Sequence, residues 1–190
     1  MDNILLKCEK NDVTVILVLD SLEIACKNEI ESLYTFRKLV DKSQIKIIEG
    51  NFGNPGSARN AALKFVDSDW IVFWDADDEP KVNEITKMIR IAESKKKAIA
   101  IGEFARYDFN EKKYILQKKV KDKSLNLQNI ARQPGIWRWA FSKSVIDSIH
   151  FPELNMGEDQ IYLLRIKFSE SCIFYYDEIT YIYTTFDCII

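Results

Sequence analysis

The sequence predicts an α/β protein, in which a mostly parallel sheet is flanked by helices and is followed by a small antiparallel part. Three observations favour this class: short apolar runs alternate with helical patterns in the first hundred residues, glycine and proline are scarce enough to mark where elements end, and 47% of the residues are hydrophobic. With 190 residues, the chain suits a single domain spanning 1–190.

Four runs rich in β-branched and aromatic residues are expected to form strands: Val13–Leu19, Ile45–Ile48, Trp70–Trp74 and Ala98–Ala105. The first three are continuous apolar runs, which are typical of strands buried on both faces of a parallel sheet. Three helical patterns separate the strands: residues 22–40, residues 57–67, and a segment from Pro80 to about Lys95. Ser57 and Asp78 are candidate N-caps of the last two helices, because their side chains accept hydrogen bonds from free backbone N–H groups.

The second half of the chain indicates a different arrangement. Residues 103–120 alternate around a polar tip at 110–113, which predicts an antiparallel hairpin. A helix with an acidic first turn is expected after Gly157, and the aromatic segment Ile173–Tyr183 is expected to be a strand.

Charge and cysteine content exclude several classes of function. Lys and Arg number 27 against 29 Asp and Glu, so a net charge of −2 provides no field that would attract nucleic acid. The four cysteines lie far apart in the sequence, which favours reduced thiols and a cytoplasmic protein. No apolar run approaches the roughly 18 residues that span a bilayer, although peripheral membrane contact stays open.

An acidic cluster follows the strand expected at Trp70–Trp74. Asp75, Asp77 and Asp78 are delivered to the carboxyl end of this strand, where ligands bind in α/β sheets. Their mutual repulsion favours a divalent cation, and Mg²⁺ or Mn²⁺ takes one or two carboxylates of this kind. The alternative is a solvated turn in which Asp78 caps the next helix.

A glycine-containing loop leads into the helix that carries Arg59. The loop, residues 51–57, has neither the P-loop ending nor the spacing of the dinucleotide fingerprint. A guanidinium at this place can pair with phosphate or with a carboxylate, and a buried structural arginine is an equal alternative.

Three segments together resemble the family-2 glycosyltransferases with the A-type fold: Gly56–Ala62, Asp75-Ala76-Asp77 and Gly157-Glu158-Asp159. The resemblance covers about residues 13–170 and implies an inverting enzyme. Such an enzyme moves a sugar from a nucleotide-diphosphate donor, most often a UDP-sugar, to a saccharide or lipid-linked acceptor. By analogy, it works in surface polysaccharide or glycolipid synthesis at the inner face of the membrane.

The resemblance also implies roles for individual residues. Asp159 is expected to be the general base, and Asp75 and Asp77 are expected to hold Mn²⁺ or Mg²⁺. The residues expected to bind the nucleotide are Asp20, Arg59 and Asp75, within a nucleotide-binding half at 1–100. The acceptor-side half, 101–190, contributes Glu158, Trp137 and Trp139, although core packing is an equal alternative for both tryptophans.

The chain departs from the family pattern near its beginning. Asp20 precedes Arg59 by 39 positions, which suits the second strand of the family, so residues 1–12 are then the tail of the first helix and the first strand is absent. Alternatively, Val13–Leu19 is the first strand and the second is lost. An abbreviated nucleotide pocket leaves two further interpretations: a weak or inactive binding or partner subunit, and a homo-oligomer formed through an uncovered sheet edge. A phosphatase of the haloacid-dehalogenase type is a third alternative for the acidic strand end.

Overall fold

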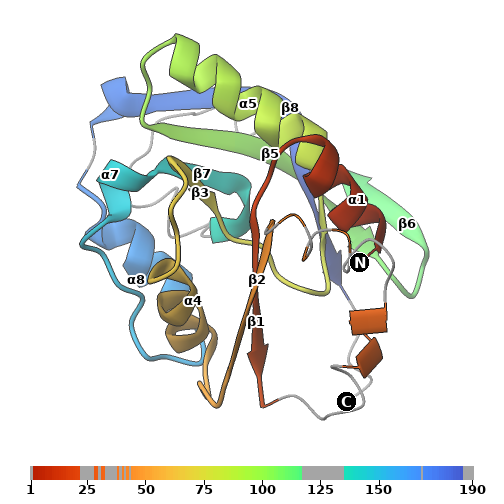
Figure 1. Cartoon of the computed structure of the whole chain (residues 1–190). Coiled ribbons are helices and arrows are strands. Elements are labelled where there is room, and N and C mark those ends of the chain that lie inside the picture. The colour runs from red at the N-terminus through yellow and green to blue at the C-terminus, as the bar shows by residue number, and fades with distance from the viewer. Residues whose placement is uncertain are drawn as a thin grey trace. The chain divides into compact units, whose positions relative to one another are not determined.

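Figure 1 shows the computed structural model of the chain, which describes residues 2–21, 28–29, 31–32, 38, 40, 42, 44–116, 135–167 and 169–185. The chain forms two compact units. Unit 1 consists of residues 1–68 and 148–162, and unit 2 consists of residues 69–147 and 163–190. The two units interleave along the chain.

Unit 1 contains a pair of parallel strands. Helix α1 (Asp2–Lys10) leads into β1 (Val15–Asp20), and β1 pairs in parallel with β2 (Ile45–Gly50). Leu5 of α1 and Ile45 of β2 form a small core, to which three partly buried side chains add: Val15, Leu17 and Ile47. Both strands and the helix before them are therefore confirmed, whereas most of the helix predicted at 22–40 falls outside the described residues.

Helix α4 (Pro55–Leu63) begins directly after the loop that follows β2. Its N-cap is Asn54, whose side chain accepts a hydrogen bond of 2.8 Å from the backbone N–H of Ser57, and Pro55 occupies the first turn. The predicted cap at Ser57 is therefore wrong, because the helix starts two residues earlier than Ser57. Helix α8 (Glu158–Arg165) opens with its two acidic residues, as predicted.

Unit 2 is built on a six-stranded sheet with the order β3-β7-β5-β8-β4, in which β6 pairs with β5. Its elements, apart from α5, are β3 (Trp70–Val72), β4 (Glu79–Pro80), β5 (Ile99–Asp108), β6 (Lys113–Leu116), η1 (Ile136–Arg138), β7 (Trp139–Ser142), α7 (Lys143–Ile146), η2 (Glu170–Cys172) and β8 (Ile173–Thr185). The β5–β6 hairpin and the C-terminal strand β8 are as predicted, while residues 117–134 lie outside the description.

The first strand of unit 2 pairs in an unexpected direction. Strand β3 pairs with β7 in antiparallel register, Ile71 opposite Phe141, although its apolar run predicted a parallel neighbour. Strand β5 is antiparallel to β7 and parallel to β8. The prediction failed because a continuous apolar run reports burial on both faces and carries no information on strand direction.

Helix α5 (Val82–Ser94) packs on the sheet of unit 2, across β5 and β8 (Figure 1). Met88 and Ala92 meet Ala100, Ala140 and Tyr176 in the core. None of the helices in the described part of the chain combines the length and the apolarity that crossing a bilayer requires.

The start of α5 differs from the prediction. Pro80 belongs to β4, which pairs with β8, and the N-cap position is Lys81, which makes no side-chain capping bond. Asp78 instead accepts a hydrogen bond of 2.7 Å from the backbone N–H of Thr184. Asp78 is therefore not a helix cap, because the chain first pairs with β8 and the helix starts only after that.

Candidate functional site

Asp20 stands at the end of β1 and holds the loop that follows β2. One oxygen of its carboxylate accepts the backbone N–H of Phe52 at 2.7 Å, and the other accepts that of Gly53 at 3.2 Å. Gly53 has a φ of +72°, a conformation that favours glycine. The side chain predicted to bind a nucleotide thus already orders the loop from which α4 begins.

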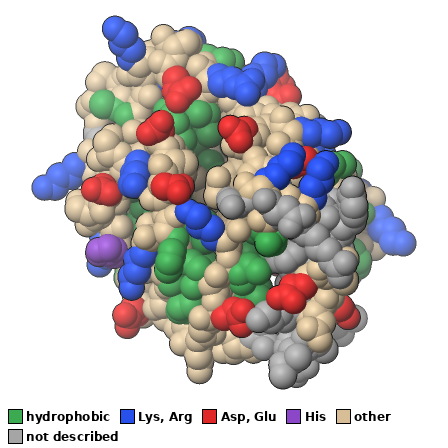
Figure 2. Space-filling model, in the orientation of Figure 1, with side chains coloured by type: hydrophobic (Ala, Val, Ile, Leu, Met, Phe, Trp, Pro, Cys, Tyr) green, Lys and Arg blue, Asp and Glu red, His purple; other side chains and the backbone are tan. Residues whose placement is uncertain are grey.

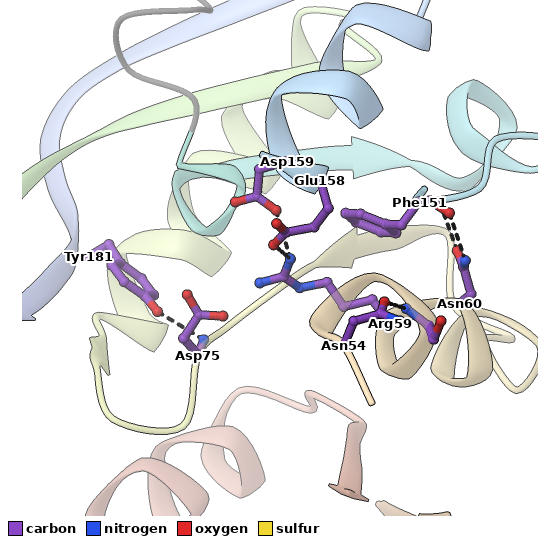
Figure 3. Close-up of polar contacts among 9 residues, drawn as sticks. Asn54, Arg59, Asn60, Asp75, Phe151, Glu158, Asp159 and Tyr181 are labelled. Carbon is purple, nitrogen blue, oxygen red and sulfur yellow. Dashed lines mark hydrogen bonds and ion pairs between the residues drawn. The ribbon is translucent and has the colours of Figure 1, made fainter. Parts of the chain in front are cut away.

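Arg59 of α4 reaches the first turn of α8 (Figure 3). Its Nη1 lies 2.8 Å from Oε1 of Glu158 and 2.7 Å from Oδ1 of Asp159. All three side chains are shielded from solvent, with exposed fractions of 14%, 11% and 17%. The sequence allowed Arg59 to pair with phosphate or with a carboxylate, and in the structure it pairs with two carboxylates. Arg59, Glu158 and Asp159 all belong to unit 1.

Asn60 secures the segment that precedes α8. Its side chain donates to the backbone O of Phe151 at 2.9 Å and accepts from the backbone N–H of the same residue at 2.8 Å. The Phe151 ring stacks on Tyr162 with centroids 3.8 Å apart, and it also lies 5.4 Å from the Arg59 guanidinium carbon. The sequence reasoning gave Asn60 no role, although its place directly after Arg59 in the helix motif was a usable signal.

The acidic turn after β3 belongs to unit 2, and its three carboxylates have different surroundings. The backbone N–H of Asp75 donates to the hydroxyl of Tyr181 at 3.0 Å (Figure 3), and Asp77 is exposed. Asp78 is buried, and this burial raises the pKa of its carboxyl to about 6, even though the N–H of Thr184 favours the charged form.

Asp75 and Asp77 offer a suitable donor set for a hard divalent cation. Mg²⁺ and Mn²⁺ need one or two protein carboxylates and complete their coordination with water and phosphate oxygens. Within the part of the chain that the structure describes, no group of three or more His, Cys, Asp or Glu side chains could enclose a metal by itself. The two aspartates therefore fit a metal that shares its coordination with a bound phosphate group.

The two tryptophans predicted at the acceptor side have different environments. Trp139 is fully buried and stacks on Phe141, so core packing describes it. Trp137 is half-buried and lies almost parallel to Tyr181, with centroids 4.5 Å apart and an interplanar angle of 14°. It also stacks on the exposed Tyr183 at 5.7 Å. Only Trp137 of the pair keeps exposed surface.

The charged surface matches the balance seen in the sequence. Figure 2 shows acidic and basic side chains interspersed among the described residues of one face, rather than gathered in a field of one sign.

Similar structures support the fold. The chain superposes on residues 1–349 of S. aureus TarS with a TM-score of 0.71 and 20% identity, covering 96% of this chain and 56% of that one. A TarS structure in complex with UDP-GlcNAc gives a TM-score of 0.71 at 20% identity, covering 96% and 54%. A complex with UDP gives 0.66 at 20% identity, covering 90% and 51%. The α/β fold class is therefore confirmed as that of the S. aureus TarS fragment.

Sequence relatives support the family. The glycosyltransferase GlyG of Streptococcus pneumoniae is 22% identical over 161 residues, which are 76% of this chain and 54% of GlyG. The chain thus spans about half the length of the proteins that it matches. Residues 2–151 match the family described as glycosyl transferase family 2. Since this match includes most of the chain, together with the Arg59 helix and the acidic turn, the chain belongs to glycosyl transferase family 2.

Proposed function

We propose that this chain transfers a sugar from a nucleotide-diphosphate donor, with a UDP-sugar favoured, to the hydroxyl of an acceptor with inversion at the anomeric carbon. The observation that carries the proposal is the Glu158–Asp159 pair, which Arg59 holds at the start of α8 in a family-2 chain. The TarS complexes with UDP and UDP-GlcNAc support the choice of donor.

The chemistry requires one base and one leaving group. The acceptor oxygen forms a bond to the anomeric carbon while the bond from that carbon to the diphosphate oxygen breaks, and the hydroxyl proton passes to the base. Asp159 is the base in this proposal, since a shielded carboxylate at a helix N-terminus is held ionised by the helix dipole and by Arg59.

Asp75 and Asp77 would hold the cation in this proposal. When bound, Mn²⁺ or Mg²⁺ supplies positive charge that stabilises a departing diphosphate. The chain's own contribution is to fix the acidic turn, because the Asp75 N–H is bonded to Tyr181 and the Tyr181 ring is stacked on Trp137. Trp137 and Glu158 are the proposed acceptor-side residues.

The acceptor is proposed to be a saccharide or a lipid-linked saccharide in surface polysaccharide or glycolipid synthesis, and the protein is proposed to act in the cytoplasm, at the inner face of the membrane. These assignments rest on analogy with the family.

The test combines binding and turnover. Donor hydrolysis and transfer should be measured with Mn²⁺ across a panel of nucleotide sugars, and UDP binding should be measured by calorimetry with and without the metal. We expect Asp77→Ala to lose metal-dependent UDP binding, and Asp159→Asn to keep binding but lose turnover. Asp147→Asn, an exposed site at the end of α7, is the matched control. No turnover together with no metal-dependent UDP binding would exclude the proposed function.

Two alternatives have distinct outcomes in the same experiment. Metal-dependent UDP binding without turnover of any donor would favour a binding or partner subunit. Hydrolysis of an aryl phosphate that depends on Asp75 would favour the phosphatase alternative, in which the first aspartate of the acidic strand end attacks phosphorus.

A homo-oligomer is proposed on one observation. Among the described residues, β1 hydrogen-bonds to β2 alone, and a two-stranded sheet is fewer strands than independent stability usually needs. Pairing of β1 with a second copy would cover its other edge. Light scattering should then give at least twice the monomer mass of 22.2 kDa, and a monomer at every concentration would contradict this arrangement.

A further inference from the structure

The Arg59 guanidinium forms ion pairs with two adjacent carboxylates. A single nitrogen, Nη1, lies within 2.8 Å of Glu158 and 2.7 Å of Asp159. Two neighbouring carboxylates in a shielded site repel each other. A guanidinium between them offsets that repulsion.

The position of Arg59 is fixed by the packing around it. Asn60 makes two hydrogen bonds with the backbone of Phe151, and the Phe151 ring packs against the guanidinium. At the start of the same helix, the N–H of Ser57 donates to the side chain of Asn54. Arg59 therefore projects from a helix that is anchored at several points, and the two ion pairs order its own side chain.

Nucleotide binding by Arg59 fits these contacts less well. A diphosphate would have to compete with two carboxylates for a charge that they already compensate, and its arrival would release two partly buried negative charges. The contacts favour a role toward the acidic pair.

We propose that Arg59 is a positioning residue, which orients Asp159 and keeps its carboxylate ionised for the transfer reaction, and that it is not a ligand of the donor diphosphate. This inference rests on the proposed function for its kinetic readout.

The other titratable groups on α8 and on the segment that precedes it in unit 1 define what the test must control. Glu158 lies on α8 itself, and the segment 148–157 adds His150 and Glu153, both exposed. Tyr162, one turn along α8, stays neutral because burial raises the pKa of its phenol. Arg59 is the cation that α4 contributes to this pair.

The kinetic test compares the pH dependence of kcat in Arg59→Gln, Arg59→Lys and Glu158→Gln. The acidic limb of this profile is the fall of kcat at low pH, where the base becomes protonated. We expect Arg59→Gln to lower kcat at least about tenfold and to move the acidic limb to higher pH by about one to three units. The Kd for UDP should change less than about threefold. Arg59→Lys should restore the acidic limb but only part of kcat, because lysine supplies the charge without the planar fork. Glu158→Gln should move the acidic limb to lower pH, because it removes the negative charge next to Asp159. Arg90→Gln, on the exposed face of α5, should change nothing.

Two outcomes would overturn the proposal. One is an unmoved acidic limb in Arg59→Gln together with a Kd for UDP that rises tenfold or more, which would make Arg59 a nucleotide ligand. The other is an Asp159 carboxyl whose titration midpoint, followed by carbon-13 NMR without donor and assigned with Asp159→Asn, is the same in wild type and in Arg59→Gln. The NMR titration needs no turnover, so it separates failure of this inference from failure of the proposed function. If Arg59→Gln does not fold, Arg59→Met, which also lacks the positive charge, carries both measurements.

Discussion

Replacing Asn60 by alanine tests the packing that underlies the site. The substitution removes both hydrogen bonds to the backbone of Phe151, 2.9 Å and 2.8 Å long, in a part-buried environment. A hydrogen bond of this kind contributes about 0.5–1.5 kcal/mol net, so the pair contributes about 2 kcal/mol. We therefore expect Asn60→Ala to lower the free energy of unfolding by about that amount.

Thermal unfolding followed by circular dichroism measures this loss. For a chain of this size, each kcal/mol corresponds to about 2–4 °C in Tm, so a decrease of about 4–8 °C is expected. Asn60→Asp retains an acceptor for the Phe151 N–H but places a carboxylate against the Phe151 carbonyl, and it should lose more than half of the same free energy. Asn155→Ala, an exposed asparagine in the same segment, is the matched control and should stay within about 0.5 kcal/mol of wild type.

The reasoning would be refuted by an Asn60→Ala protein that unfolds at the same temperature as Asn155→Ala. Equal stability would mean that water or a shifted backbone replaces the two bonds at no cost. The Arg59 ion pairs would then have to be held by contacts other than the clamp on Phe151.

Two further predictions concern close packing and thiol chemistry. In Gly56→Ala, the added Cβ would lie 2.3 Å from the backbone O of Pro152, so a loss of about 1–3 kcal/mol in urea unfolding is expected, and an unchanged midpoint would contradict the close approach. Iodoacetamide should label Cys172 with a pH midpoint below the ordinary thiol value, because hydrogen bonds from Ser169 lower its pKa, whereas Cys8 should stay unlabelled in the folded protein, because burial raises its pKa to about 12. Peptide mass spectrometry separates the thiols, and equal labelling of Cys8 and Cys172 would be inconsistent with these environments.

Strand positions could be predicted from the sequence, but strand partners could not. The apolar runs at Val13–Leu19 and Trp70–Trp74 look alike in composition, and both contain strands. One pairs in parallel with β2 and the other pairs antiparallel with β7. The burial that makes a run apolar does not depend on the direction of its neighbour, so only long-range topology distinguishes the two.

The N-cap residues of the helices could not be predicted from local sequence either. Asn54 and Ser57 are both good capping residues, and each precedes a plausible helical pattern. The structure selects Asn54 because Pro55 suits the first turn and Gly56 lets that turn approach Pro152. Asp78 is likewise a good cap by type, yet it is used by Thr184 of β8, more than a hundred positions away. A local pattern cannot anticipate such a competing partner.

The motif around Arg59 could be interpreted from its sequence as a phosphate-binding element, but its contacts are with another segment of the chain. Gly56, Arg59 and Asn60 are spaced as neighbours on one helix face, and all three engage the segment from 151 to 159. Gly56 meets its backbone, Asn60 clamps its beginning, and Arg59 holds the carboxylates at its end. A glycine followed three residues later by arginine and asparagine is therefore the signature of a helix that docks on the start of α8. The motif fixes where Asp159 stands. If Asp159 is the base, as proposed above, a substitution at any of the three positions should affect turnover through that carboxylate.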